Sequence, residues 1–216
     1  MNEQRRQRLE REISIVNNIT IKAQEAYLIV SYLEKDEDDN AIMYHKRMNT
    51  FFYYSRVIYW QITIIELAKL LNEKEKFSIA RIIAKVKKDG DYSELGVPAA
   101  QIHKWEAIMR NENESIINLK EQRDKVYAHE DGSENINNLI PLFKIEILLG
   151  LCKDIILEFG KLLGLPHRMF DVINSPAISL KHGIHMIAKK SNNEMEKYRD
   201  LARQYNLEDE LPPETS

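Results

Sequence analysis

The spacing of apolar residues over the first 34 positions predicts one long helix. Apolar or small side chains recur at steps of three and four residues, which places them on one face of an α-helix. The stripe consists of Leu9, Ile13, Val16, Ile19 or Thr20, Ala23, Tyr27 and Val30. We therefore expect a helix over about residues 4–34 that packs one face against the rest of the protein.

A second predicted helix, from Ala41 to Leu71, has apolar side chains pointing in most directions. Many of them are aromatic: Tyr44, Phe51, Phe52, Tyr53, Tyr54, Tyr59 and Trp60. The acidic stretch at residues 34–40 separates the two helices, and its Asp and Asn residues can cap the second one. A helix with this much apolar surface is expected at the centre of the fold or against a second chain.

Turn and cap residues divide the remaining chain into further helices. Proline suits the first turn of a helix, and glycine suits the position just after its end. By these signals we expect a short amphipathic helix and two long ones, at residues 77–86, 99 to about 129, and 141 to about 160–164. Further along, residues 167–189 are compatible with a loop, a short helix or a β-ribbon, residues 194–205 are helical again, and residues 207–216 fray.

The predicted fold class is all-α. The 7 Gly and 6 Pro residues together are about half the usual share of ~12%, which favours long helices and few turns. Four long helices joined by polar turns predict an antiparallel four-helix bundle over residues 1–165. Residues 166–216 are expected to form a less regular C-terminal appendage with a flexible acidic tail.

Composition narrows the functional classes. Lys and Arg number 31 and Asp and Glu 34, so the net charge is 31 − 34 = −3, which excludes a protein that grips nucleic acid by bulk positive charge. The single cysteine, Cys152, excludes an internal disulfide, and its leucine and isoleucine neighbours predict a core position. Neither an apolar leader nor an uncharged apolar stretch of ~18 residues occurs, so we expect a cytoplasmic protein without membrane contact.

Standard catalytic and metal-binding signatures are absent from the sequence. It contains no Gly-rich phosphate loop, no Gly-x-Ser-x-Gly elbow and no His-Glu-x-x-His helix. The spacing of His182 and His185 would suit a metal, but a third ligand is lacking. We expect neither a metal nor a cofactor.

One segment, residues 121–131, concentrates charged and hydrogen-bonding groups at the end of a long predicted helix. It reads Glu-Gln-Arg-Asp-Lys-Val-Tyr-Ala-His-Glu-Asp. Arg123-Asp124, followed by four residues and His129, resembles the Arg-x(4–6)-His signature of the HEPN superfamily. The run Arg-Asp-Lys-x-x-Ala-His-x-Asp is similar to the abortive-infection branch of the Abi-U type.

A second feature shared with this family lies upstream. Residues 67–71 and 77–83 resemble the family's helix, short polar turn and Ser-containing short helix. With the motif, the resemblance covers about residues 40–165. It implies a metal-independent endoribonuclease that acts as a toxin or phage-defence effector, and a protein antitoxin as a partner. In some toxins of this family, a nucleotidyltransferase antitoxin neutralises the toxin by modifying a Tyr two residues after the motif His. This chain has Asp131 at that position, so the resemblance does not extend to this modification.

The chemistry of RNA cleavage suits these residue types. RNA carries its own nucleophile, the ribose 2′-OH, so cleavage to a cyclic phosphate requires proton transfer and positive charge near the phosphoryl oxygens. Histidine exchanges protons near neutral pH, and arginine offers a permanent charge on a planar fork. The resemblance implies that Arg123 holds the phosphate, that His129 transfers protons or contacts phosphate, and that Asp124 orients one of them. Further candidate substrate contacts are Lys120, Lys125 and Tyr127.

Helix geometry limits how one chain can use this motif. At about 100° per residue, the six steps from Arg123 to His129 leave the two side chains ~120° apart around a regular helix. Either the last turn unwinds before Asp131-Gly132, or the site is composed from two chains. The family usually pairs two motifs across a homodimer. We therefore expect a stable homodimer in which Arg123 and His129 of both chains line one cleft.

A different functional class stays open, a non-catalytic helical module that binds RNA, nucleotide or a partner protein. A histidine at a helix C-terminus is favourable through the helix dipole, and helix ends commonly collect charges. A series of basic residues either holds an RNA backbone or forms solvated helix faces. Its members are Arg81, Lys85, Lys87, Lys88, Lys104, Arg110, Lys120, Arg123 and Lys125.

Overall fold

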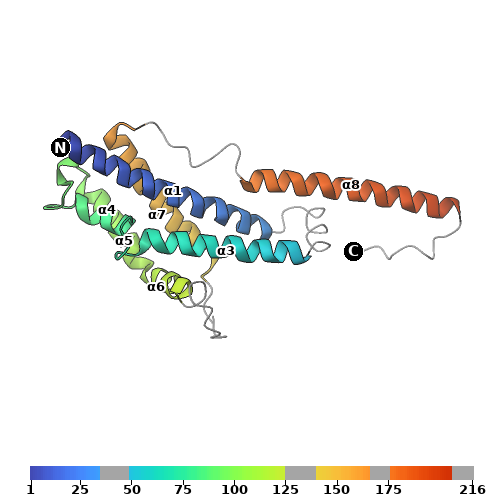
Figure 1. Ribbon diagram of the computed structural model, residues 1–216. Coiled ribbons are helices and arrows are strands. Elements are labelled where there is room, and N and C mark those ends of the chain that lie inside the picture. The colour runs from blue at the N-terminus through green and yellow to red at the C-terminus, as the bar shows by residue number, and fades with distance from the viewer. Residues whose placement is uncertain (35–48, 125–139, 166–175, 206–216) are drawn as a thin grey trace.

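The protein is all-α throughout the residues that its computed structural model describes, which are 1–34, 49–124, 140–165 and 176–205. The helices are α1 (Glu3–Glu34), α3 (Asn49–Leu71), α4 (Ile79–Val86), α5 (Ala99–Asn111), α6 (Asn113–Gln122), α7 (Leu142–Leu163) and α8 (Pro176–Gln204), with a 3-10 turn η1 (Ser93–Leu95) (Figure 1). The predicted fold class is therefore confirmed.

The helix α1 contacts both α3 and α7 along its length (Figure 1). Arg56 Nη1 of α3 lies 3.2 Å from Glu34 Oε1 at the end of α1, so α3 runs back along α1. Arg6 Nη2, near the start of α1, donates to the carbonyl oxygen of Leu163 at the end of α7 over 2.8 Å. Both neighbours thus run antiparallel to α1. The description of the whole as a regular four-helix bundle stays a prediction.

The apolar stripe predicted for α1 is its buried face. Leu9, Ile13, Val16 and their successors along the stripe are buried, and the open choice between Ile19 and Thr20 falls on Thr20. The hydroxyl of Thr20 donates to the carbonyl oxygen of Val16 over 2.9 Å, which satisfies a buried polar group inside the helix. A polar residue can therefore occupy the core face.

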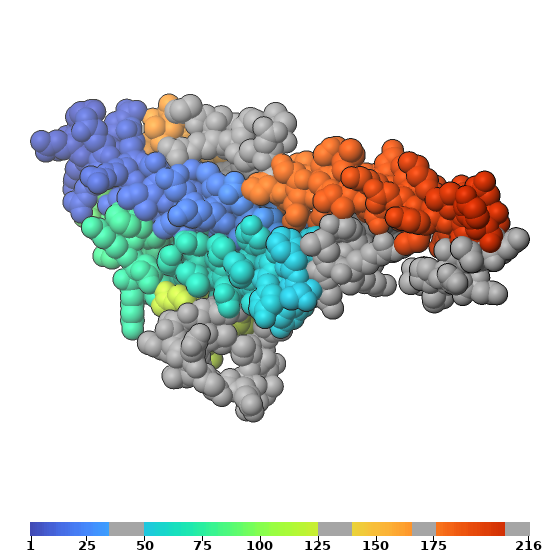
Figure 2. Space-filling model, turned by 45° about the vertical axis from the view of Figure 1, so that its right-hand side comes forward, coloured from blue at the N-terminus to red at the C-terminus, as the bar shows by residue number. Residues whose placement is uncertain are grey.

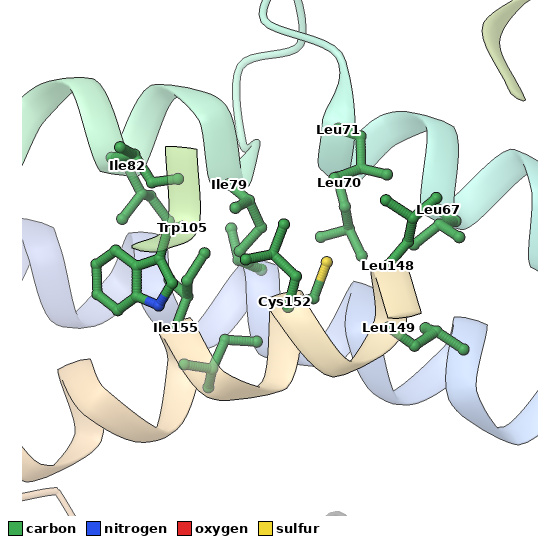
Figure 3. Packing of buried hydrophobic residues seen from close by; sticks show 14 of the residues in the cluster. Leu67, Leu70, Leu71, Ile79, Ile82, Trp105, Leu148, Leu149, Cys152 and Ile155 are labelled. Atoms are coloured by element: carbon green, nitrogen blue, oxygen red, sulfur yellow. The ribbon is translucent and has the colours of Figure 1, made fainter. Parts of the chain in front are cut away.

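The main core forms where α7 meets α3, α4 and α5 (Figure 3). Leu148 and Cys152 of α7 lie near Leu67 of α3, while Ile155 lies beside Trp105 of α5 (Figure 3). The Trp105 indole also stacks on Phe159 at a ring-centroid distance of 6.3 Å. Its Nε1 donates to Asp154 Oδ2 over 3.2 Å, so its one polar group has a partner.

The long helix predicted from residue 99 towards His129 is wrong as a single element. The chain forms α5 and α6 instead, interrupted at Glu112. The buried Glu112 carboxylate accepts from Lys144 Nζ over 2.8 Å and from Ser115 Oγ over 3.1 Å. The flanking Asn111 and Asn113 have low helix propensity, so interrupting the helix there costs little free energy. A buried charge that needs these partners thus redirects the chain.

Residues 176–205 are more regular than predicted. Over residues 176–189 the loop and β-ribbon alternatives are wrong, because these residues form the first half of α8. Pro176 stands at the first position of this helix, where its missing N–H costs nothing. A small second cluster joins α8 to the body: Ile184 and Leu180 pack with Tyr32 of α1 and Phe52 of α3. Beyond this cluster α8 projects away (Figures 1 and 2).

The aromatic side chains of the second predicted helix are only partly covered. That helix is seen as α3, and residues 41–48 of the predicted range lie outside the described residues. Phe52 is buried, whereas Phe51, Tyr53, Tyr54 and Ile58 are exposed. The first half of α3 therefore presents a large apolar surface outside the core.

A matched pair of glycines tests the packing after α4. A Cβ at Gly90 would lie 2.6 Å from the carbonyl carbon of Lys85 and 2.8 Å from the Ala84 oxygen, whereas one at Gly150 in α7 meets nothing within 4 Å. We expect Gly90→Ala to lower the free energy of unfolding by about 1–3 kcal/mol. We expect Gly150→Ala to raise it by up to about 1 kcal/mol. Urea unfolding measures both, and shifts of equal sign and size would contradict this packing.

The reactivity of Cys152 tests its place in the core. Burial raises the pKa of its thiol to about 12, and the thiolate is the reactive species. At pH 8 the folded protein should therefore react with a thiol reagent such as dithiobis-nitrobenzoate at least on the order of a hundredfold more slowly than the unfolded chain. The control is the same protein in guanidinium chloride, which should release one equivalent at once. Equal rates would place the thiol at the surface.

Candidate functional site

The motif arginine stands where α6 ends. One side of α6 is buried, and it consists of Ile116, Leu119 and Gln122. Arg123 follows directly, and its backbone N–H donates to the carbonyl oxygens of Leu119 and Lys120. Arg123 and Asp124 continue the chain in a wider, π-helical turn, a conformation that is frequent at functional sites. The anchored side of α6 therefore determines where the guanidinium lies.

Two carboxylates hold the Arg123 guanidinium. Its Nε donates to Asp124 Oδ1 over 2.7 Å, and its Nη1 donates to Glu75 Oε1 over 2.9 Å. The Arg123 side chain is 20% exposed and that of Glu75 is 40% exposed. The group is thus partly withdrawn from water, yet solvent and solutes can reach it.

The electrostatics keep Arg123 charged. The hydrogen bond that Arg123 donates to Asp124 raises the pKa of the Arg123 guanidinium most, burial opposes this, and the charge of Asp124 and the contact with Glu75 raise it further. A group with a permanent positive charge suits an anion such as phosphate. The same charge is already balanced by two carboxylates in this structure.

The turn that supplies Glu75 joins α3 to α4 and has a defined shape. Asn72 Oδ1 accepts from the backbone N–H of Lys74 over 3.1 Å, and the N–H of Glu75 donates to the Asn72 carbonyl over 3.1 Å. Ser78 then caps α4, its hydroxyl oxygen accepting from the N–H of Arg81 over 3.3 Å. The turn between residues 67–71 and 77–83 and the start of segment 121–131 therefore meet in space through the contact between Glu75 and Arg123.

The described residues hold half of the predicted site. Arg123 and Asp124 are in direct contact, and the expected role of Asp124 in orienting a catalytic residue stays a prediction. Lys120 lies half-buried one turn earlier on α6. Lys125, Tyr127 and His129 lie outside the described residues. The predicted separation of ~120° between Arg123 and His129 assumes a regular helix, and the α-helix already ends at Gln122.

Sequence reasoning missed Glu75. It stands in an exposed run of alternating charges, Glu73-Lys74-Glu75-Lys76, which is typical of an ordinary solvated turn. Its only distinguishing property is the contact with Arg123, 48 positions along the chain. A local pattern carries no signal for such a contact.

Several members of the predicted basic series have carboxylate partners. Lys85 Nζ lies 2.7 Å from Glu12 Oε2, and Lys104 Nζ lies 3.2 Å from Asp154 Oδ2. Lys87 forms an ion pair with Glu106. The charge of these three lysines is therefore compensated within the protein, which favours solvated helix faces over a continuous RNA-holding surface at these positions.

The described residues contain neither a group of metal-ligating side chains nor a membrane-spanning helix. Among residues 1–34, 49–124, 140–165 and 176–205, no three His, Cys, Asp or Glu side chains are grouped as metal ligands would be. His182 and His185 lie exposed on α8. Over the same residues no helix has both the length and the apolar character needed to cross a bilayer.

Comparison of the chain with models of known protein families, with curated proteins and with solved structures found no match.

Proposed function

We propose that this protein is a metal-independent endoribonuclease of the HEPN type that acts as a toxin or phage-defence effector. The observation that carries the proposal is the guanidinium of Arg123. It lies at a helix end, partly buried, oriented by Asp124 through a 2.7 Å contact and still reachable by solutes. A permanently charged, oriented fork of this kind is what recognition of a phosphate requires.

The proposed reaction is a transfer of the phosphoryl group to the neighbouring 2′-oxygen. The 2′-OH loses its proton and attacks the phosphorus, and the bond to the 5′-oxygen of the next nucleotide breaks. That oxygen takes up a proton, which leaves a 2′,3′-cyclic phosphate and a 5′-hydroxyl end. Arg123 would stabilise the charge on the phosphoryl oxygens, and His129 would transfer a proton. Lys120, Lys125 and Tyr127 would contact the RNA.

A homodimer belongs to the proposal because proteins of the HEPN type usually pair two motifs across a homodimer. The exposed apolar surface at the start of α3 supports it, since Phe51, Tyr54 and Ile58 lie at helical spacing and are each more than half exposed. Surfaces of this kind commonly mark protein–protein contacts. This surface lies at the end of α3 opposite to the turn that contacts Arg123, so it supports assembly and not the composite cleft itself. The family resemblance is what implies that a second copy brings two arginines and two histidines to one cleft.

The alternative is a non-catalytic helical module that binds RNA, nucleotide or a partner protein. The two ion pairs of Arg123, with Glu75 and with Asp124, favour this alternative. An arginine that serves only to stabilise the fold is held by carboxylates in the same way. In that case Arg123 would anchor α6 to the turn after α3. Activity separates the two functions directly.

Cleavage of RNA is the first expected outcome. Purified protein should cut total RNA in the presence of EDTA, and His129→Ala should lower kcat/KM by about 10²- to 10⁴-fold, the usual contribution of a general acid or base. Arg123→Gln should lower it as well. The rate is followed by gel electrophoresis with mass spectrometry of the new ends.

The matched control is His103→Ala, because His103 is an exposed histidine of α5 and lies outside the motif. It should cut as fast as wild type. Wild-type protein that leaves RNA intact, or a His129→Ala variant that cuts normally, would favour the binding module.

The mass in solution is the second expected outcome. Light scattering at micromolar concentration should return about twice 25.4 kDa. Tyr54→Asp should dissociate this dimer by placing a charge in an apolar interface of at least ~1,000 Å². Tyr198→Asp on α8 serves as the control, because Tyr198 is 66% exposed and Tyr54 60%. A monomer mass for wild type would rule out the composite site.

A further inference from the structure

Both edges of the Arg123 guanidinium are already engaged. An arginine binds phosphate through two parallel N–H groups on one edge, either Nη1 with Nη2 or Nε with Nη2. Glu75 accepts from Nη1 over 2.9 Å, and Asp124 accepts from Nε over 2.7 Å. Each edge therefore has one nitrogen in contact with a carboxylate. A phosphate that binds with two hydrogen bonds on either edge therefore meets a nitrogen that a carboxylate already contacts, and competes with that carboxylate for it.

Glu75 is the partner that can leave. Asp124 follows Arg123 directly in the chain, so the two side chains stay near each other whatever occupies the site. Glu75 comes from the turn between α3 and α4, 48 positions away in the chain, so the covalent chain does not hold its carboxylate beside Arg123. Both carboxylates are partly exposed, Glu75 at 40% and Asp124 at 58%, so water can replace either contact and chain connectivity is what distinguishes them. Without Glu75, Nη1 would have no carboxylate partner among the described residues, so an anion could contact it.

The charges around Arg123 also favour competition between Glu75 and an anion. One guanidinium and two carboxylates add to +1 − 2 = −1 at this position. A polyanion approaching Arg123 therefore meets a locally negative group until Glu75 moves aside. Lys74 and Lys76 flank Glu75 in the sequence and are exposed, so the turn keeps positive charge once the carboxylate has moved.

We propose that Glu75 is a gate on Arg123: it occupies the guanidinium in the free protein and competes with the RNA phosphate for it. This inference depends on the proposed function, in which Arg123 holds the phosphate. It adds that RNA binding includes the displacement of Glu75. Glu75 acts here as a positioning residue, since it sets the availability of Arg123 and takes no part in the bond changes.

The test measures binding of a fluorescein-labelled, single-stranded 2′-O-methyl RNA oligonucleotide of mixed sequence. The methyl group blocks the 2′-oxygen, so cleavage does not disturb the measurement. Fluorescence anisotropy compares wild type with Glu75→Gln, which removes the charge but keeps the size. The matched control is Glu73→Gln, an equal charge change on the same exposed turn without an ion pair to Arg123 among the described residues.

Glu75→Gln should bind about two- to fivefold more tightly than Glu73→Gln, the range that loss of an exposed ion pair implies. In an Arg123→Gln background the same substitution should bring no gain, because the competition no longer exists. With cleavable RNA, Glu75→Gln should lower KM and leave kcat unchanged. A merely structural contact would instead lower kcat or the thermal stability.

Each alternative outcome has a separate meaning. Equal affinities of Glu75→Gln and Glu73→Gln, with Arg123→Gln binding more weakly than wild type, would overturn the gate and leave the proposed function standing. Equal affinities of wild type and Arg123→Gln would overturn both. Circular dichroism melting checks that each variant folds. If Glu75→Gln does not fold, Glu75→Asp decides, since its shorter side chain withdraws the carboxylate and should also bind more tightly than wild type.

Discussion

The apolar surface of α7 is the constraint on which the rest of the structure depends. Its buried residues occupy most sides of the helix: Ile145, Leu148, Leu149, Leu151, Cys152, Ile155, Ile156, Phe159 and Leu163. Burying each large apolar side chain contributes about 1.5–3 kcal/mol, so the helix is stable only when others surround it. The contacts of α1, α3 and α5 with α7 meet this need. The ends of these helices, where the chemistry lies, are positioned as a consequence.

The break at Glu112 connects this core to the candidate site. A buried carboxylate is costly unless it is paired, and Lys144 at the start of α7 provides the pairing. The junction between α5 and α6 is thereby attached to α7. From there α6 extends along α3, and its end meets the turn after Leu71. Arg123 and Glu75 are close because α6, which begins at the Glu112–Lys144 ion pair, packs along α3.

The environment of Arg123 combines two properties that a phosphate site needs with one that opposes binding. The guanidinium is oriented by Asp124 and partly shielded from water, which strengthens its interaction with an anion. The same carboxylates that orient it also neutralise it. The apolar surface at the start of α3 is a separate feature, because α3 carries it at the end opposite to the turn that holds Glu75. Assembly through α3 and phosphate recognition by Arg123 at the end of α6 would thus use different parts of the protein.

The sequence by itself determined the features that are local or periodic. The apolar stripe placed α1 within a residue of its observed bounds, and Pro141 and Gly164 marked the two ends of α7. The core position of Cys152 followed from its apolar neighbours. Periodicity and caps report which side of a helix avoids water and where the helix stops, and both are properties of a few adjacent residues.

Only the tertiary structure decided the division into α5 and α6, the continuous α8 and the pairing of Glu75 with Arg123. The break at Glu112 depends on Lys144, which lies on another helix. The contact between Glu75 and Arg123 joins residues 48 positions apart. Whether two such residues meet depends on the directions that packed helices take in space, and a pattern along one helix does not encode those directions.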